Sequence, residues 1–343
     1  MSAAPTGIDL TSFARWAATA LPDTTPPFTA EVIAGGQSNI TAHVCDADGR
    51  DFVVRRPPLH GVLPTAHDMG REHRIIAALG PTPVPVPAAL AYCDDPNVIG
   101  APFYVMSYVE GIVLHDGDTA IAQLDQTARA HSGESLIDAL VALHAVDVDA
   151  VGLGDLARRE ELVARQLKRW HAQFDASKTR DLPAVDRVHE LLSARIPPQR
   201  ESTVVHGDFR LGNCIVDPDG DIRAVLDWEI CTLGDPRADI GYVLATWAQP
   251  DDPLRADDHN PTLAPGFSTR EALLDRYAAR SGRDVDAIPY FVAFSFWRLA
   301  CILEGVLARH LSGARGENDV NLDSFRRRVE SCARLAEEYA SGL

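Results

Sequence analysis

One short acidic stretch of the sequence, residues 202–229, contains six carboxylates. Two of them, Asp208 and Asp227, together with Asn213, flank two apolar runs with the composition of strands. Carboxylate and amide oxygens are ligands that suit Mg²⁺, an ion that proteins usually share with substrate phosphates. The stretch therefore predicts a magnesium and phosphate site. A loop of exposed acidic side chains is the alternative.

A tight turn is expected between the two apolar runs, because the letters DPDGD favour one. A hairpin centred on Asp219 would place Asn213 opposite Val225 and close to Asp227. Asp208 precedes Asn213 by five residues, in the loop after the run TVV. The hairpin would thus gather the three side chains at one end, where a divalent cation would offset the repulsion between the carboxylates.

Glu72 lies on the apolar stripe of the helix expected over residues 66–79. A carboxylate that faces a core needs a cationic partner. The nearest candidates are Arg55 and Arg56, which end the apolar run FVVRR. Successive strand residues point to opposite faces, so only one of them can face Glu72. The alternative is that Glu72 lies at a helix edge and both arginines are solvated.

The composition excludes several classes of partner. The 343 residues include 49 acidic and 32 basic ones, for a net charge of −17, which argues against nucleic acid and against an anionic membrane surface. No apolar run approaches the ~18 residues of a membrane span, and the N-terminus lacks the layout of a signal peptide. The six cysteines are scattered without zinc-ligand spacing. We therefore expect reduced thiols and a cytoplasmic protein.

The expected elements divide the chain into a β-rich first third and a mostly helical remainder, with a domain boundary after residue 107. A ligand cleft would most naturally lie between two such lobes. In the first third we expect helices over 9–20 and 66–79 and strands within 30–56 and up to 111. Beyond it we expect strands within 203–228 and helices over 119–147, 155–195, 236–247, 269–281, 286–311 and 319–340.

From about residue 30 to 340 the chain resembles the aminoglycoside phosphotransferase and choline kinase-like family. The resemblance rests on the stretches HGDFRLGN, LDWE, VVRR, REHRIIAAL, PFYVMSYVEG and LGDPRADIGYVLATW. Through RRPP, PTPVPVP and DWEICTLGDP the chain is most similar to the kinase-like domain fused to some acyl-CoA dehydrogenases. The resemblance implies an α+β, two-lobed protein-kinase-like fold. Its small β-rich N-lobe, residues 1–107, would bind the nucleotide, and its larger, mainly helical C-lobe, residues 108–343, would hold the catalytic hairpin and the acceptor pocket.

The resemblance also implies roles for individual residues. Asp208 would be the catalytic base that accepts the proton of the acceptor hydroxyl, and Asn213 and Asp227 would hold Mg²⁺. Arg55, fixed by Glu72, would contact the nucleotide phosphates. A phosphate-covering loop and a hinge would complete the nucleotide site: Gly35, Gly36, Gln37 and Ser38, then Met106, Ser107 and Tyr108.

The implied activity is transfer of the γ-phosphate of ATP or GTP, with Mg²⁺, to a hydroxyl group of a small molecule. His206 and Asp239 would support the catalytic loop. The letters DWE replace Asp-Phe-Gly and no activation segment follows, which argues against a protein acceptor. Two alternatives stay open: a nucleotide-binding, pseudokinase-like module without transfer activity, and a metal-dependent phosphohydrolase. The expected partners are a nucleotide and a small hydroxylated acceptor, with no nucleic acid and no membrane.

Overall fold

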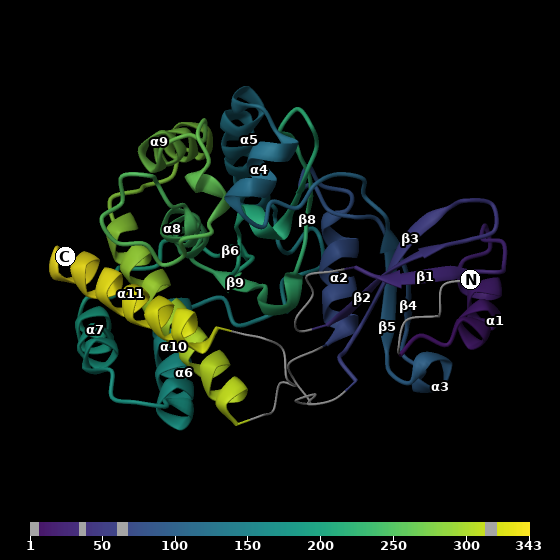
Figure 1. The fold of residues 1–343 in the computed structure, drawn as a ribbon, viewed down its shortest axis with the longest axis horizontal. Helices are drawn as coiled ribbons and strands as arrows, with labels where there is room; N and C mark the ends of the chain where they lie inside the picture. Colours follow the sequence, from purple (N-terminus) through teal and green to yellow (C-terminus); the bar gives the residue numbers. More distant parts are fainter. Residues whose placement is uncertain (1–6, 34–38, 60–67, 313–320) are drawn as a thin grey trace. The chain divides into compact units, whose positions relative to one another are not determined.

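The computed structural model describes residues 7–33, 39–59, 68–312 and 321–343. The chain forms two compact units, shown with their labelled elements in Figure 1. The first unit is Met1–Glu110 together with Ala224–Glu229, and the second is Gly111–Arg223 together with Ile230–Leu343. The short segment Ala224–Glu229 therefore belongs to the first unit, although the sequence analysis places it in the second lobe.

The first unit is built on an antiparallel sheet whose described strands lie in the order β1-β2-β3-β5-β4. Helices α1 and α2 cover opposite faces of this sheet (Figure 1). The expected β-rich first third is thus confirmed. The strands are β1 (Thr29–Val32), β2 (Ile40–Cys45), β3 (Asp51–Arg56), β4 (Ala89–Cys93) and β5 (Phe103–Ser107), and the helices are α1 (Leu10–Ala20), α2 (Met69–Leu79) and α3 (Pro96–Ile99).

Side-chain alternation along β3 separates the two faces of the sheet. Phe52 and Val54 join the apolar cluster beneath α1, where Phe13 is fully buried. Arg55 lies on the other face and is paired in register with Thr41 on β2 and Tyr104 on β5. The central strand of the sheet, β3, therefore holds a charged side chain between its two neighbouring strands.

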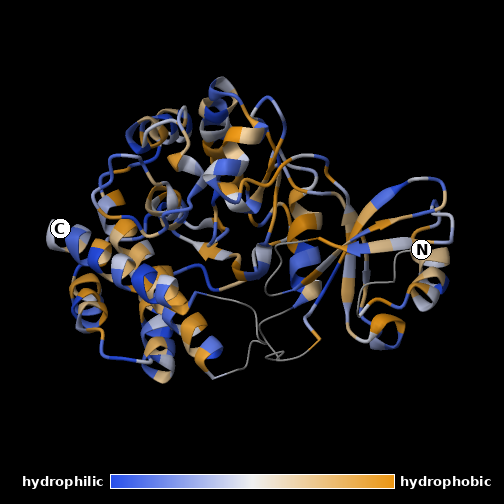
Figure 2. Ribbon diagram, in the orientation of Figure 1, coloured by the Kyte–Doolittle hydropathy of each residue, from blue (hydrophilic) through white to orange (hydrophobic). Residues whose placement is uncertain are grey.

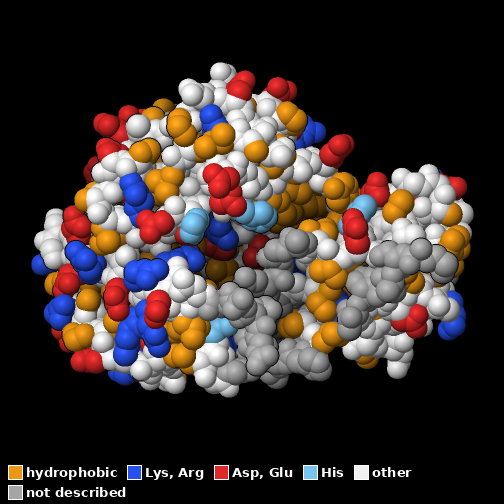
Figure 3. Space-filling model, viewed as in Figure 1, with side chains coloured by type: hydrophobic (Ala, Val, Ile, Leu, Met, Phe, Trp, Pro, Cys, Tyr) orange, Lys and Arg blue, Asp and Glu red, His pale blue; other side chains and the backbone are white. Residues whose placement is uncertain are grey.

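The second unit is mostly helical, and its longest helix, α10, packs against α6, α7, α8 and α11. Hydrophobic and hydrophilic residues alternate along α11 (Figure 2). This pattern is typical of a helix with one buried face. Over the visible face of this unit, acidic and basic side chains are interspersed (Figure 3). The helices are α4 (Gly117–Gln123), α5 (Gln126–His144), α6 (Leu162–Ser177), α7 (Pro183–Ala194), α8 (Arg237–Thr246), α9 (Arg270–Ser281), α10 (Ile288–Leu311) and α11 (Leu322–Ser341).

Helix α10 is long and apolar enough to cross a membrane by length and composition, contrary to the expectation that no segment reaches this length. In the structure 72% of its apolar window is buried inside the protein. Because this helix packs on four others, its apolar composition is that of a core helix.

Two of the expected long helices are each a pair of shorter ones, so the single helices predicted over 119–147 and 155–195 are wrong. The first pair is divided before α5, where Asp125 caps the new helix by accepting a hydrogen bond from the Ala128 N–H. The second pair is divided before α7, where Pro183 begins the helix. Apolar periodicity continues through both interruptions, and this continuity concealed them.

The expected hairpin is confirmed. Strand β7 (Cys214–Val216) pairs with β8 (Ile222–Val225), and the Asp217 N–H donates to the Asp221 carbonyl, the register of a turn centred on Asp219. A second small sheet joins β6 (Thr203–Val205) to β9 (Thr232–Gly234). Short 3₁₀ helices complete the described elements: Leu211–Asn213, Trp228–Ile230 and Pro261–Leu263.

Candidate active site

The loop after β6 carries Asp208 and is held from behind by Asp239. One carboxylate oxygen of Asp239 accepts the His206 N–H at 2.7 Å, and the other accepts the Gly207 N–H at 2.8 Å. Gly207 has φ +86°, a backbone conformation that side chains rarely adopt, and an added Cβ would lie 3.2 Å from Ile230. The loop is thereby turned so that Asp208 follows a rigid, doubly anchored backbone. His206 and Asp239 lie where the resemblance implies.

Asp208 and Asn213 are in direct contact within the second unit. The Asn213 amide nitrogen donates to the Asp208 carbonyl at 2.8 Å and to its carboxylate Oδ2 at 2.7 Å. The other carboxylate oxygen lies 3.6 Å from Arg210 Nε, and about a quarter of the Asp208 side chain is exposed. Asp208 is thus oriented by its neighbours and remains accessible to a substrate.

A buried network supports Asp239 and was only partly visible in the sequence. His144, at the end of α5, joins the Asp239 carboxylate at 3.4 Å to the Tyr277 hydroxyl at 2.8 Å. Burial acts to raise the pKa of Asp239, but its hydrogen bond with His144, the nearby His206 and the Gly207 N–H together hold that pKa below its ordinary value. The sequence analysis missed this role of His144.

Arg298 on α10 is a second support that the sequence analysis missed. Its guanidinium donates to the Gly207 carbonyl, and it lies 4.8 Å from the centre of the Tyr242 ring. Burial and the charge of Asp208 both raise the pKa of Tyr242, so the phenol keeps its proton beside that carboxylate. A buried arginine in an apolar helix needs such partners. Its position inside α10 is the signal that could have revealed it.

In the first unit, Arg55 joins two carboxylates. Its guanidinium donates from Nε to Glu72 at 3.0 Å and from Nη2 to Asp227 at 2.6 Å. Glu72 is only 2% exposed and also accepts the Tyr104 hydroxyl at 3.1 Å. Burial opposes the charge of Arg55, but Glu72, Tyr104 and Asp227 more than offset it, so the pKa of the guanidinium is raised. The predicted pairing of Glu72 with an arginine is confirmed.

Arg56 points to the opposite face of the sheet, beneath α1. It donates to the backbone carbonyls of Pro57, Gly7 and Ile99. These carbonyls accept from its Nε and Nη1 atoms, and the described residues offer it no carboxylate. Of the two candidates, Arg55 is therefore the one that faces Glu72.

The segment that carries Asp227 is tied to the first unit by its backbone. The Val225 N–H donates to the Pro85 carbonyl at 2.8 Å, and the Trp228 indole N–H donates back to the Val225 carbonyl at 3.0 Å. Asp227 itself has φ +66°, which is uncommon for a residue with a side chain. Such strained positions cluster at functional sites.

Some polar groups of the implied hinge are already used in hydrogen bonds within the first unit. The Ser107 N–H donates to the Ala88 carbonyl at 2.9 Å, and the Ser107 hydroxyl accepts the Ala88 N–H at 2.9 Å. Met106 is buried in β5, and the exposed Tyr108 ring lies near His43, with the centroids 4.6 Å apart and the ring planes tilted by 41°. The Ser107 N–H is thus already used within the first unit. The implied phosphate-covering residues Gly35, Gly36, Gln37 and Ser38 lie outside the described residues.

The predicted metal ligands offer the right kind of atoms. Asn213 uses its amide nitrogen on Asp208, which leaves its Oδ1 for a cation. Asp227 uses Oδ1 on Arg55, which leaves its Oδ2. Together with Asp208 these are hard oxygen donors, and they fit Mg²⁺. Convergence of Asp227 with Asp208 and Asn213 stays a prediction, because they belong to different units.

Comparison with known proteins fixes the family. The model of the phosphotransferase enzyme family matches residues 29–285. The chain belongs to the phosphotransferase enzyme family. Mouse acyl-CoA dehydrogenase family member 10 is 36% identical over 310 residues, which cover 89% of this chain and 28% of that protein. The phosphotransferase chain thus spans about a quarter to a third of such curated relatives.

Solved structures show the same fold. A protein from Ralstonia eutropha assigned as an aminoglycoside phosphotransferase is 31% identical, with a TM-score of 0.80 over 97% of this chain and 98% of that one. An aminoglycoside phosphotransferase in ternary complex with AMP-PNP and hygromycin B has a TM-score of 0.62 at 15% identity, covering 92% and 95% of the two chains. The expected α+β, protein-kinase-like fold, with a sheet-based N-lobe and a helical C-lobe, is confirmed. The roles of individual phosphotransferase residues stay predictions.

Proposed function

We propose that this protein transfers the γ-phosphoryl group of ATP or GTP to a hydroxyl group of a small molecule. The observation that carries the proposal is the contact of Asp208 with Asn213 in a chain that belongs to the phosphotransferase enzyme family. The Arg55–Glu72 ion pair supports it independently, because a buried arginine held in place by a glutamate can offer its other guanidinium donors to phosphate oxygens.

Asp208 accepts the proton of the attacking hydroxyl. The Asn213 amide fixes the rotation of its carboxylate, and the Asp239 anchors fix its backbone, so the base is oriented before the substrate arrives. Arg55 binds phosphate oxygens and is itself held by Glu72. Asn213 and Asp227 would hold Mg²⁺, an ion that would supply positive charge to the transferred phosphoryl group.

The relatives suggest which acceptors to test first. One solved relative holds hygromycin B, a hydroxylated aminoglycoside, and the curated relatives are described as acyl-CoA dehydrogenase family members. We therefore propose two acceptor classes, amino-bearing polyols and hydroxyacyl compounds. In the second class the hydroxyl group would be the phosphorylated position.

The deciding experiment is a screen for acceptor-stimulated ADP or GDP release, with Mg²⁺ and either nucleotide, followed by mass spectrometry of the product. A phosphorylated acceptor supports the proposal. Nucleotide binding without product from any acceptor favours the pseudokinase-like alternative. Nucleotide hydrolysis that no acceptor stimulates favours the phosphohydrolase. Asp208→Asn separates enzyme turnover from contaminating activity, because it should remove the product at unchanged protein concentration.

A further inference from the structure

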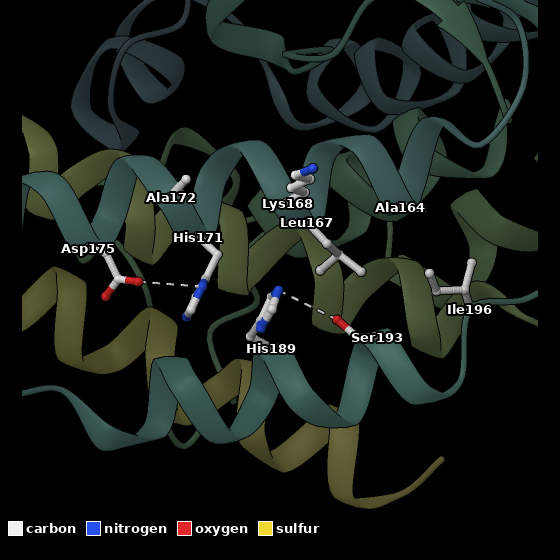
Figure 4. Close-up of a pocket in the computed structure, with 9 residues that line it drawn as sticks. All are labelled: Ala164, Leu167, Lys168, His171, Ala172, Asp175, His189, Ser193 and Ile196. Atoms are coloured by element: carbon white, nitrogen blue, oxygen red, sulfur yellow. Dashed lines mark hydrogen bonds and ion pairs between the residues drawn. The ribbon is translucent and has the colours of Figure 1, made fainter.

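Helices α6 and α7 line an open cavity of about 490 Å³ within the second unit, and Figure 4 shows its lining. Apolar residues such as Leu167 and Ile196 line one part of it. His171, Asp175 and His189 line the other part, with side chains from both helices. None of these residues belongs to the candidate active site, so the polar end of the cavity is a separate feature.

Three side chains here bring ligand atoms of mixed type close together. His171 and Asp175 are one turn apart on α6, and Asp186 lies on α7. One ring nitrogen of His171 lies 2.9 Å from Asp186 Oδ1, and the other lies 3.7 Å from Asp175 Oδ2. One ligand atom from each of the three residues lies within 4.8 Å of the others.

We propose that His171, Asp175 and Asp186 bind a divalent transition-metal ion of the zinc type. Zn²⁺ takes histidine nitrogen and carboxylate oxygen at about 2.0–2.2 Å, in a tetrahedral arrangement. The two carboxylates face different nitrogens of the His171 ring, so one of them would have to turn toward the nitrogen that binds the ion, a side-chain rotation that is open to half-exposed groups. The adjoining cavity leaves room for a water or an anion as fourth ligand.

The neighbouring residues are compatible with this site. Lys178 pairs with Asp175 Oδ1 at 2.8 Å, while the other oxygen, Oδ2, faces His171. Asp175 can therefore bind a cation and keep its lysine, as supporting hydrogen bonds on metal-bound carboxylates do. The His189 ring stacks on the His171 ring, 3.9 Å between centroids and 7° between planes, and on its far side approaches Trp297. This stack restricts the rotation of the ligand ring.

The ligand set distinguishes this site from the proposed Mg²⁺ site. Imidazole suits Zn²⁺, Cu²⁺ and Ni²⁺, whereas Mg²⁺ takes oxygen ligands. The site was not visible as a zinc motif, because its ligands come from two helices and include no cysteine. Its signal in the sequence is a histidine and an aspartate four positions apart, followed by an aspartate in the next helix.

The test is titration of the whole protein with ZnCl₂ by calorimetry in the presence of excess Mg²⁺, which occupies oxygen-only sites. Wild type should bind one Zn²⁺ per chain at this site. Asp186→Asn, which keeps the shape of the side chain, and His171→Gln should each weaken binding by roughly tenfold or more. The matched control is His131→Gln. His131 also contacts an aspartate, Asp221, at 2.8 Å, and the described residues give that pair no third ligand.

A second readout is the melting temperature. Zn²⁺ should raise it in wild type and in His131→Gln, and not in Asp186→Asn. The proposal fails if wild type binds no Zn²⁺, or if Asp186→Asn and His171→Gln bind it as tightly as the control. Either result is independent of phosphoryl transfer, since no acceptor or nucleotide enters the experiment.

Discussion

The guanidinium of Arg55 lies 2.6 Å from a carboxylate oxygen of Asp227, although 172 positions separate the two residues in the sequence. The same side chain also pairs with Glu72, so one cation is shared between two carboxylates. Glu72 is almost fully buried, whereas 29% of the Asp227 side chain is exposed. A ligand can therefore compete for Arg55 on the Asp227 side, while Glu72 keeps it in place.

Asp208→Asn should lower phosphoryl transfer by about 10²–10⁴-fold, because the amide cannot accept the hydroxyl proton. Nucleotide binding should change little, since the proposed base is Asp208 and the proposed phosphate contact is Arg55. Product formation and nucleotide affinity are measured on the same preparation by mass spectrometry and calorimetry.

Asp219→Asn is the matched control for this change. It removes the same charge from the exposed turn of the β7–β8 hairpin and should leave transfer unaltered. Equal activity of wild type and Asp208→Asn with a known acceptor would contradict the assignment of the base.

Arg55→Gln and Arg56→Gln should have different effects, because the two side chains leave opposite faces of β3. Arg55→Gln removes a charged contact worth about 1.5–3 kcal/mol, so the KM for nucleotide should rise roughly tenfold or more. Arg56→Gln removes hydrogen bonds to backbone carbonyls and should lower the free energy of unfolding with little change in nucleotide KM. Steady-state kinetics and denaturant titration measure the two quantities. The reverse pattern would show that Arg56 is the phosphate contact.

Asp239 should make the protein sensitive to acid. The pKa of its carboxyl is lower in the folded state than in the unfolded state, where it is about 3.9. Its contribution to stability is therefore present above that unfolded value and is lost as the pH falls through the lower folded pKa. Asp239→Asn should lower the free energy of unfolding by about 3–5 kcal/mol near neutral pH. This difference in the free energy of unfolding from wild type should shrink below about pH 4.

Denaturant titrations across this pH range measure the effect, with Asp258→Asn as the control. Asp258 is an exposed aspartate of the same unit. The free energy of unfolding of its variant should differ from that of wild type by the same amount at every pH. A constant difference between wild type and Asp239→Asn would show that the buried carboxylate does not titrate with folding.

Gly207→Ala should reduce both stability and turnover. The left-handed backbone at φ +86° costs a residue with a side chain about 1–2 kcal/mol, and the new Cβ would press on Ile230. Gly49→Ala has nearly the same φ, +81°, with nothing within 4 Å of the added carbon. Gly49→Ala should therefore show the backbone cost alone. If the two variants have the same kcat, the position of the catalytic loop does not depend on Gly207.

The sequence was sufficient for features that depend on local pattern. Alternation and turn residues predicted the β-rich first third and the β7–β8 hairpin, and helical spacing predicted that Glu72 faces inward. The breaks before α5 and α7 were missed, because apolar periodicity runs through them and only the caps at Asp125 and Pro183 mark them.

Features that depend on contacts between distant residues were not accessible in this way. His144 meets Asp239 across 95 positions and Tyr277 across 133, and no local pattern records such distances. Arg298 could have been suspected, since a charge inside an apolar helix requires a partner. Its partner, the Gly207 carbonyl, could not be named from the sequence.

Segment Ala224–Glu229 has a practical consequence for dissecting this protein. The first unit is discontinuous in the chain, because the polypeptide returns to it after 113 intervening residues, Gly111–Arg223, and then leaves again. A recombinant fragment that stops at Glu110 would keep Glu72 but lack Asp227, the second carboxylate partner of Arg55, and the hydrogen bond from Val225 to the Pro85 carbonyl. A simple N-terminal fragment therefore does not contain the whole first unit; a circularly permuted gene, or one that joins Ala224–Glu229 to the fragment through a linker, is needed to restore the missing segment.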